Sequence, residues 1–512
     1  MDAATTQHQN QHHSNRWIIL GFLGLAQLMV VLDATIANVA LPSIQQSLGF
    51  SNVDRQWLIT AYSLAFGSLL FLGGRLSDLL GRKTTLQLGL VGFAFASALG
   101  GAAQSFSMLV AARAIQGAFG AVLAPAALAM VTTAFTDPDE RGKAFGIYGS
   151  IAGAGAAIGL LLGGILTQYL DWRWCLYVNL IFAGIALVGT QILLVRERGT
   201  ASGGLDVPST ALISGGLFAI VFGLSNAATK ATNDAAAGLH VTLATAFGNA
   251  TTIACLLGGV ALVGVFAWRQ TRIEKPMLPM GVILDRARGG SFLSILIAAA
   301  AMFATFFFLT FYLQQVHGYS PVRAGLSFLP MIVVLSATAA TASTKLLPRL
   351  GPRPLVVTGM ALGTGGMVIL TQLTVTSSYA TNVLPGLLVL GMAMGLVFAM
   401  SMNTATARVQ PEYAGSASAT VNVTQQVGGS IGTALLSTVA IAATIAILPN
   451  GNLRITPTQL KLFESGAQVH GYTTAFWWAA ALFGVGTIVA AAVLPSGRPE
   501  RVTAEPELVA AV

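Results

Sequence analysis

Long apolar stretches separated by short polar segments recur along the whole chain. A helix that crosses a bilayer needs roughly 17 to 25 predominantly apolar residues. Fourteen stretches meet this condition, at about residues 17–41, 56–74, 84–104, 107–135, 144–169, 174–195, 208–225, 250–268, 289–315, 322–344, 354–374, 382–407, 415–447 and 473–495. The pattern predicts an all-α membrane protein. The spans at 208–225 and 250–268 are the weakest, because they flank a polar loop, and without this pair the count is twelve.

Composition supports lipid as the main solvent of the chain. Of the 512 residues, 54% are hydrophobic and only 9% are charged, whereas a soluble domain carries roughly 25% charged residues. The 57 glycines suit membrane helices that approach one another closely. The net charge of +8 comes from scattered basic residues rather than a basic cluster, so we expect a lipid bilayer and no nucleic acid as partner.

The distribution of lysine and arginine predicts the topology. If the N-terminus is inside, 19 of the 26 basic residues fall in inner segments. The outer segments hold Arg55, Arg173, Lys230, Arg323, Arg454 and Lys461, and Arg113 lies within a span. Because basic residues concentrate on the cytoplasmic side of a membrane, both termini are expected to be cytoplasmic. The chain is then a multi-pass protein of the cell membrane with an even number of spans.

The loop between the second and third spans has the pattern G-x-L-x-D-x-x-G-R-K. Its members are Gly74, Asp78, Gly81, Arg82 and Lys83. Glycine permits the strained backbone of a tight turn, and a carboxylate such as Asp78 can pair with a helix N-terminus. The loop is therefore interpreted in one of two ways: as a latch that stabilises one conformation of the protein, or as a basic turn without a gating role. A similar loop at 345–354 suggests two related six-helix halves.

Several motifs, taken in order, resemble one family. The loop at 74–83 resembles the signature loop of the major facilitator superfamily, and further stretches resemble its fourteen-span drug:proton antiporter branch. These stretches are 32–42, 113–120, 159–164, the DWRW segment at 171–174 with Asn179, 313–330 and 422–432. The resemblance covers 17–495. It implies a major facilitator fold with two six-helix bundles and two additional central transmembrane helices, and a gating role for Gly74, Asp78, Gly81, Arg82, Lys83 and Arg141.

The spans and the resemblance together predict the domain organisation. Residues 1–15 are expected to be a disordered cytoplasmic tail and 497–512 a second cytoplasmic tail. An N-terminal six-helix bundle is expected at 16–199, a C-terminal six-helix bundle at 286–496, and two inserted helices with an outer loop at 200–285.

Asp33 and Arg113 are charges within apolar spans. A charge at a helix centre costs about 2.5–3.5 kcal/mol on insertion scales, and such charges usually face a cavity or a partner. Arg113, Gln116 and Gly117 share one helical face with Gly120. Burial favours a protonated carboxyl and a nearby arginine favours the charged form, so we predict that Asp33 and Arg113 couple transport to protons. The alternative for Asp33 is a carboxyl that is simply kept protonated or hydrogen-bonded to a neighbour.

Polar and aromatic residues in the spans are candidates for a substrate cavity. The candidates are Asp33, Gln116, Phe303, Phe307, Phe311, Gln314, Asn422, Gln425 and Gln426. Flat apolar or cationic compounds suit such a lining. Hydrogen bonds between helices are an equal alternative for the Asn/Gln stripe, and core or lipid packing is an alternative for each phenylalanine.

The fifth span carries the glycine motif that the resemblance ties to antiport. Gly155, Gly159 and Gly163 are spaced by four, which places them on one ridge for close helix packing, and Gly164 follows. The family pattern has proline after the second glycine, where this chain has Leu160. The departure removes the expected kink and leaves the close-packing surface.

The sequence contains no nucleotide-binding loop, no metal-ligand cluster and no catalytic triad pattern. We therefore expect a monomeric secondary transporter rather than an enzyme, without metal or cofactor, driven by the proton gradient. The predicted function is proton-coupled efflux of hydrophobic or cationic drugs by alternating access, which confers antibiotic resistance. The alternatives are an exporter dedicated to one endogenous metabolite or antibiotic, a proton symporter, and a membrane scaffold that transports nothing.

Overall fold

Helices make up all the secondary structure that the computed structural model describes. The described residues are 3–52, 54–135, 137–194, 206–237, 239, 241–274, 276–278, 280–406, 414–447 and 457–496. Each of the fourteen predicted spans falls on a helix, and 13 helices of the described chain are long and apolar enough to cross a membrane. The span predicted at 144–169 falls on α5, whose described apolar stretch is Ala157–Tyr169. The chain is thus an all-α membrane protein, as predicted.

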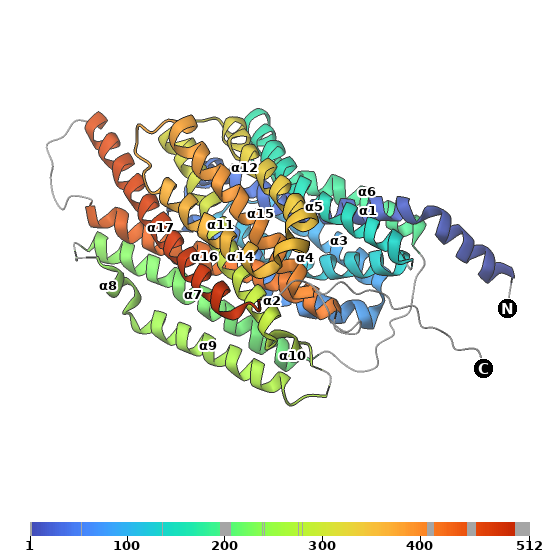
Figure 1. Ribbon diagram of the computed structural model, residues 1–512. Helices are drawn as coiled ribbons and strands as arrows, with labels where there is room; N and C mark the ends of the chain where they lie inside the picture. Colours follow the sequence, from blue (N-terminus) through green and yellow to red (C-terminus); the bar gives the residue numbers. More distant parts are fainter. Residues whose placement is uncertain are drawn as a thin grey trace.

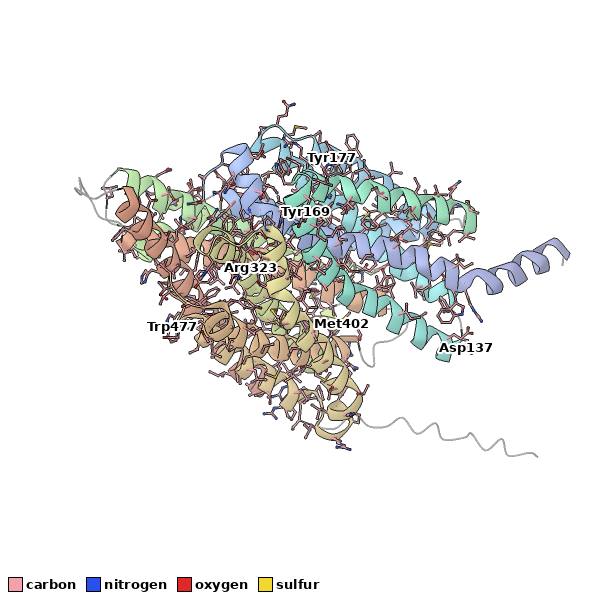
Figure 2. All side chains as sticks on the ribbon, turned by 90° about the horizontal axis from the view of Figure 1, so that it is seen from above. Asp137, Tyr169, Tyr177, Arg323, Met402 and Trp477 are labelled. Carbon is pink, nitrogen blue, oxygen red and sulfur yellow. The ribbon has the colours of Figure 1, made fainter. Side chains whose placement is uncertain are left out.

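The first six long helices form the N-terminal half. They are α1 (Ala3–Leu48), α2 (Trp57–Leu80), α3 (Arg82–Gly101), α4 (Phe106–Ala134), α5 (Pro138–Tyr169) and α6 (Trp174–Leu193), with the 3₁₀ turn η1 (Asp54–Gln56) before α2. Helices α2 and α3 pack on α4, and α1 packs on α5 and α6. Helix α1 begins at Ala3, within the segment 1–15 for which a tail was predicted, and its first turns project beyond the other helices (Figures 1 and 2). Extending a helix that already exists avoids the unfavourable nucleation step.

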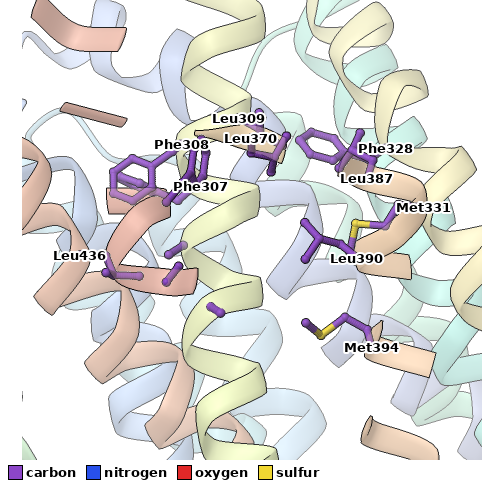
Figure 3. Close-up of a cluster of buried hydrophobic side chains, with 14 of the residues drawn as sticks. Phe307, Phe308, Leu309, Phe328, Met331, Leu370, Leu387, Leu390, Met394 and Leu436 are labelled. Carbon is purple, nitrogen blue, oxygen red and sulfur yellow. The ribbon is translucent and has the colours of Figure 1, made fainter. Parts of the chain in front are cut away.

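The C-terminal half comprises the last six long helices and four short segments. They are α11 (Arg286–Phe311), the π-helix η2 (Tyr312–Val316), α12 (Pro321–Thr341), the π-helix η3 (Ala342–Leu346), α13 (Leu347–Leu350), α14 (Pro352–Leu370), the π-helix η4 (Tyr379–Val383), α15 (Leu384–Thr406), α16 (Ala414–Ile447) and α17 (Pro457–Val493). Large buried side chains such as Phe307, Phe328 and Leu390 hold these helices together (Figure 3). The domain limits given above stay a prediction.

Two further long helices lie between the halves in the chain. This segment contains α7 (Val207–Ala236), α8 (Leu243–Phe247), α9 (Ala250–Gln270) and α10 (Met280–Ile283). Helix α7 packs against α2 and α16, so it contacts both halves, and α9 packs on α7 at the periphery (Figure 1). Arg269 at the end of α9 donates to the Asp206 carboxylate before α7 at 2.9 Å, which fixes the two helix ends together.

Equivalent glycine turns in the two halves hold equivalent helix ends. Gly81 before α3 and Gly351 before α14 both have positive φ, 87° and 77°, a conformation that favours glycine. Two residues after each glycine, a basic side chain reaches the last helix of its own half. Lys83 donates to the Leu194 carbonyl at 2.6 Å after α6, and Arg353 donates to a carbonyl in the last turn of α17 at 2.5 Å. Cations stabilise helix C-termini, so the two loops are structural counterparts.

The halves contact one another at the end of the molecule where α1 and α5 finish, which we call the predicted outer end. The Gln314 side chain donates to the Val39 carbonyl at 2.8 Å. The backbone N–H of Val322 donates to the Gln168 side chain at 3.4 Å. Each bond joins the N-terminal half to the start of α12 or to η2 beside it, so the halves are closed together at this end.

Candidate functional site

The carboxylate of Asp33 lies fully buried inside the N-terminal half. Arg113 on α4 approaches its Oδ2 to 2.6 Å. The side-chain amides of Gln116 on α4 and Asn179 on α6 donate to its Oδ1 at 2.7 and 2.8 Å. Two helices thus supply donors to a carboxylate on α1, and the cation and two amide donors satisfy its ionised form.

A second layer of contacts holds the donors in place. Arg113 also donates to the Gln116 side-chain oxygen at 2.7 Å and to the Leu58 carbonyl at 3.2 Å. Its guanidinium lies 4.4 Å from the centre of the Tyr62 ring. The Gln116 amide donates to the Ser97 hydroxyl at 2.7 Å. Because Arg113 has these other partners, its position does not depend on the charge of Asp33 alone.

The side chain of Asn179 also supplies a free hydrogen-bond acceptor to the Asp33 site. Its side-chain Oδ1 is buried and has no hydrogen-bond partner within the part of the chain that the structure describes. A buried polar atom without a partner costs about 1–3 kcal/mol, so such atoms in native structures call for an explanation. A protonated Asp33 needs an acceptor for its O–H, and the Asn179 amide can present its oxygen after rotating by half a turn.

The glycine ridge of α5 packs on the turn of α1 that carries Asp33. A Cβ added to Gly159 would lie 2.0 Å from Thr35 Oγ1. One added to Gly163 would lie 2.9 Å from the Ile36 side chain, and Gly155 faces the neighbouring turn at 3.1 Å. These distances leave no room for larger side chains at the three glycine positions. Because glycine has no side chain, α5 can approach α1 closely on either side of Asp33.

The adjacent face of α5, about 100° around the helix, contacts the C-terminal half. Leu160 is fully buried, and its carbonyl oxygen lies 2.5 Å from where a Cβ on Gly325 would be. A Cβ on Gly164 would lie 2.7 Å from the Cα of Val322. Both partners belong to α12. One helix therefore contacts the Asp33 turn with one face and the other half of the molecule with the adjacent face.

The predicted gating loop is described in part. Gly81 adopts the positive φ noted above, and Lys83 binds the end of α6. Space is open around Gly74, and Arg82 is half-buried. The side chains of the other two gating candidates, Asp78 and Arg141, lie outside the residues that the structure describes.

The substrate candidates fall into two groups. A Cβ on Gly67 of α2 would lie 3.3 Å from Gln426 of α16, where the halves meet, and one on Gly429 would lie 2.8 Å from the Phe303 ring. Asn422, Gln425, Gln426 and Phe303 are half-buried. The remaining candidates are in contact with the other half or buried: Gln314 bonds to α1, Gln116 belongs to the Asp33 network, and Phe307 and Phe311 are buried.

A small cavity lies beside Arg113 on its outer side. Its volume is about 10 Å³, which is roughly the space of one water molecule. Apart from Arg113, it is lined by apolar side chains and Cys175, including Leu58, Leu109 and Trp172. An apolar lining thus separates the ion pair from the predicted outer end in this conformation.

The sequence did not single out every member of this network. We predicted no role for Tyr62, Ser97 or the Leu58 carbonyl, because a tyrosine, a serine and a backbone carbonyl are ordinary in a membrane helix. Asn179 was noted only for its place in a motif. A signal for it existed, since Asn179 is a side-chain amide near the start of a largely apolar span.

Comparison with known proteins identifies the family. The sequence model of the Major Facilitator Superfamily matches residues 23–433. The chain belongs to the major facilitator superfamily. As a member it is a multi-pass membrane transporter rather than an enzyme, as the sequence predicted. A puromycin resistance protein of Streptomyces alboniger is 45% identical over 482 residues, which cover 94% of this chain and 90% of that one. A tetracenomycin C resistance and export protein of Streptomyces glaucescens is 30% identical, with 88% and 82% covered.

Solved structures agree on the fold. A bacterial homologue of the human lysosomal transporter Spinster, in an inward-facing and occupied conformation, superposes with a TM-score of 0.62 at 14% identity. The alignment covers 93% of this major facilitator chain and 96% of that one. The nucleoside transporter NupG gives a TM-score of 0.63 at 11% identity, with 94% and 100% covered. At these identities the likeness shows the fold alone.

Proposed function

We propose that this transporter exports hydrophobic or cationic compounds, antibiotics among them, in exchange for protons. The observation that carries the proposal is the buried Asp33 carboxylate with Arg113, Gln116 and Asn179 around it. Intramembrane carboxylates are costly and usually serve ion or proton pathways. Relatives named for antibiotic resistance and export support the direction of transport. The chain acts as a monomer without a cofactor.

Asp33 carries the proton in this proposal. A proton that arrives from outside binds the carboxylate and removes its charge, which weakens the contact with Arg113. Arg113 keeps its bonds to Gln116 and Leu58 and its contact with Tyr62, so its guanidinium still has hydrogen-bond partners. The new O–H is accepted by the amide oxygen of Asn179. When the site opens inward, Arg113 favours the charged form again and the proton leaves.

Helix α5 transmits this change between the halves. Protonation alters the turn of α1 that holds Asp33, and Gly159 and Gly163 of α5 lie directly against that turn. Leu160 and Gly164 on the adjacent face of α5 contact α12. A shift of α5 by a fraction of an ångström therefore changes the interface that closes the predicted outer end, because packed interfaces switch between discrete arrangements.

The substrate binds where α2, α11 and α16 face one another. Phe303 supplies an aromatic surface, and Asn422, Gln425 and Gln426 supply polar groups in the same region. Apolar walls with a few polar groups are typical of sites for small organic molecules. The loop residues Gly74, Asp78, Gly81, Arg82, Lys83 and Arg141 serve as the inner gate in this proposal.

Transport by the purified protein in proteoliposomes tests this function. An inward-directed proton gradient should drive export of puromycin and of an aromatic cation such as ethidium, and a protonophore should abolish it. Simultaneous recording of internal pH should show substrate-dependent proton movement. Transport that persists unchanged without a proton gradient contradicts proton coupling, and proton movement in the same direction as the substrate indicates symport.

A dedicated exporter is the second candidate. The 45% identity to a puromycin resistance protein over 94% of the chain favours a narrow range of substrates. Growth inhibition of an expressing strain by dyes, quaternary ammonium compounds and several antibiotics separates the two. Protection against puromycin alone supports the dedicated exporter, and protection across chemical classes supports the broad one.

A further inference from the structure

Arg55 is a buried cation in a cage of aromatic rings. It lies in η1 at the predicted outer end, and only 6% of it is exposed. Its guanidinium lies 3.8 Å from the centre of the Phe311 ring, 5.4 Å from that of Phe307 and 5.9 Å from that of Tyr472. It also donates to the Tyr472 hydroxyl at 3.4 Å. These distances are typical of cation–π contacts.

The charge of Arg55 is balanced by these rings rather than by an acid. Among the described residues, no carboxylate lies within 4.0 Å of its nitrogens. The neighbouring Asp54 accepts instead from the Ser51 hydroxyl at 2.7 Å. Burying an unpaired charge is unfavourable, and desolvated cation–π contacts are the strongest of their kind. The rings therefore compensate for the lost hydration of the guanidinium.

The cage belongs to one half and its occupant to the other. Phe307 and Phe311 lie on α11 and Tyr472 lies on α17, both in the C-terminal half, whereas Arg55 precedes α2. Other rings of the same half support the cage: the ring centres of Phe307 and Phe311 are 5.3 Å apart, and the Phe308 ring packs on Tyr472 at 5.5 Å. The cage is thus built into the C-terminal half and stays in place if Arg55 withdraws.

We propose that Phe307, Phe311 and Tyr472 form a binding site for organic cations, which Arg55 occupies as an internal ligand while the predicted outer end is closed. When the halves part at this end, Arg55 leaves with the N-terminal half and the ring faces become accessible. A compound with a planar or quaternary cationic group takes the same position on its way out. When Arg55 returns, it displaces the bound compound, so Arg55 both closes the interface and empties the site. The inference rests on the proposed alternating-access export.

Equilibrium binding to the full chain in nanodiscs tests the site. The probe is radiolabelled benzyltrimethylammonium, and benzyl alcohol serves as the uncharged counterpart. Arg55→Gln should raise the affinity for the cation about tenfold, since it removes the competing internal cation and its contact with the rings. The affinity for benzyl alcohol should stay within about twofold, because a neutral ring gains no cation–π attraction.

Two further variants identify the site. In the Arg55→Gln background, 3,4,5-trifluorophenylalanine at position 311 preserves the ring shape but withdraws electron density from its face, so the gain in cation affinity should disappear. The matched control is Arg323→Gln. Arg323 is exposed near the start of α12 (Figure 2), and its guanidinium lies 3.8 Å from the Tyr319 ring within one half. This control should leave cation affinity unchanged.

Three results would overturn the inference: an unchanged cation affinity in Arg55→Gln, an equal gain for benzyl alcohol, or a gain that survives fluorination at position 311. An equal gain for both probes would mean that the substitution merely opens an apolar space. The measurement needs no proton gradient. If wild-type transport proves independent of protons while the binding results hold, the proposed antiport fails and the cation site stands.

Discussion

The Asp33 carboxylate and the Arg113 guanidinium lie 2.6 Å apart, and both side chains are almost completely buried. They come from different helices and are surrounded by amides and by an aromatic ring. Removing one partner of such a pair typically destabilises a protein by about 3–5 kcal/mol. The pair is therefore at once a structural tie between α1 and α4 and the charge that the proposed proton exchange changes.

Neutralising Arg113 alone should be worse than neutralising both members of this pair. Arg113→Gln leaves the carboxylate without its cation, and we expect a loss of roughly 3 kcal/mol in unfolding free energy. The double variant Asp33→Asn with Arg113→Gln should recover a large part of this loss. Unfolding in detergent monitored by tryptophan fluorescence gives the coupling energy.

A surface pair supplies the comparison. Arg16 and Glu140 are also 2.6 Å apart but more than a fifth exposed, so Glu140→Gln should change stability by less than about 1 kcal/mol. An equal loss of stability in Glu140→Gln and Arg113→Gln would contradict the importance of burial at Asp33.

Gly159→Ala should damage both stability and transport. The added methyl group would meet Thr35 Oγ1 at 2.0 Å, and such overpacking costs roughly 1–3 kcal/mol. Because the helix would move away from the Asp33 turn, we expect proton-driven export to fall more than downhill substrate exchange. Gly184→Ala on α6 is the control, since it has nothing within 4 Å. Similar losses in both variants would argue against a specific role for the α5–α1 contact.

Asn179→Leu should impair proton-driven export more than downhill exchange of substrate. The substitution removes the hydrogen bond to the ionised Asp33 carboxylate at 2.8 Å and also the acceptor that we propose for the protonated form, so both states of the site lose a partner. Export driven by a proton gradient and downhill exchange of labelled substrate in proteoliposomes check this. Asn38→Ala is the control, because Asn38 donates to the Ala34 carbonyl on its own helix. Unchanged proton-driven export by Asn179→Leu would remove it from the proton site.

The contact between Asp206 and Arg269 should make the inserted helices sensitive to acid. Burial raises the pKa of Asp206, but hydrogen bonds from Ser209 and Arg269 outweigh it and hold the pKa below its usual range. A lowered pKa contributes stability above the unfolded value of about 3.9, and the contribution is lost as the pH falls through the folded pKa.

Thermal unfolding between pH 7 and pH 3 checks this. The wild type should lose more thermal stability than Asp206→Asn over this range, and the variant should already be less stable at pH 7. Parallel curves would show that Asp206 contributes nothing through its charge.

Much of the fold was predictable from the sequence, for physical reasons. Runs of apolar residues predict helices well because lipid leaves the backbone no other partners. The same reasoning singled out Asp33 and Arg113 as costly charges that need a partner. It could not predict that the two residues contact each other, because the angle and register of two packed helices depend on side chains throughout both.

The remaining differences concern single side chains. Phe307 and Phe311 were predicted as candidates for a cavity lining, and the structure places them in a closed cage around Arg55, a residue that the sequence marked only as an outer basic residue. Leu160 marked a departure from the family motif, and the structure shows that this position packs against α12. Contacts between distant segments decide these roles, and no local pattern reports them.

Proton-driven transport by Asp33→Asn in proteoliposomes tests the central claim most directly. The amide matches the carboxylate in shape but cannot release a proton. The account predicts that export driven by the proton gradient is lost, while downhill exchange of labelled substrate and membrane insertion persist. Export at the wild-type rate in response to the gradient would contradict it.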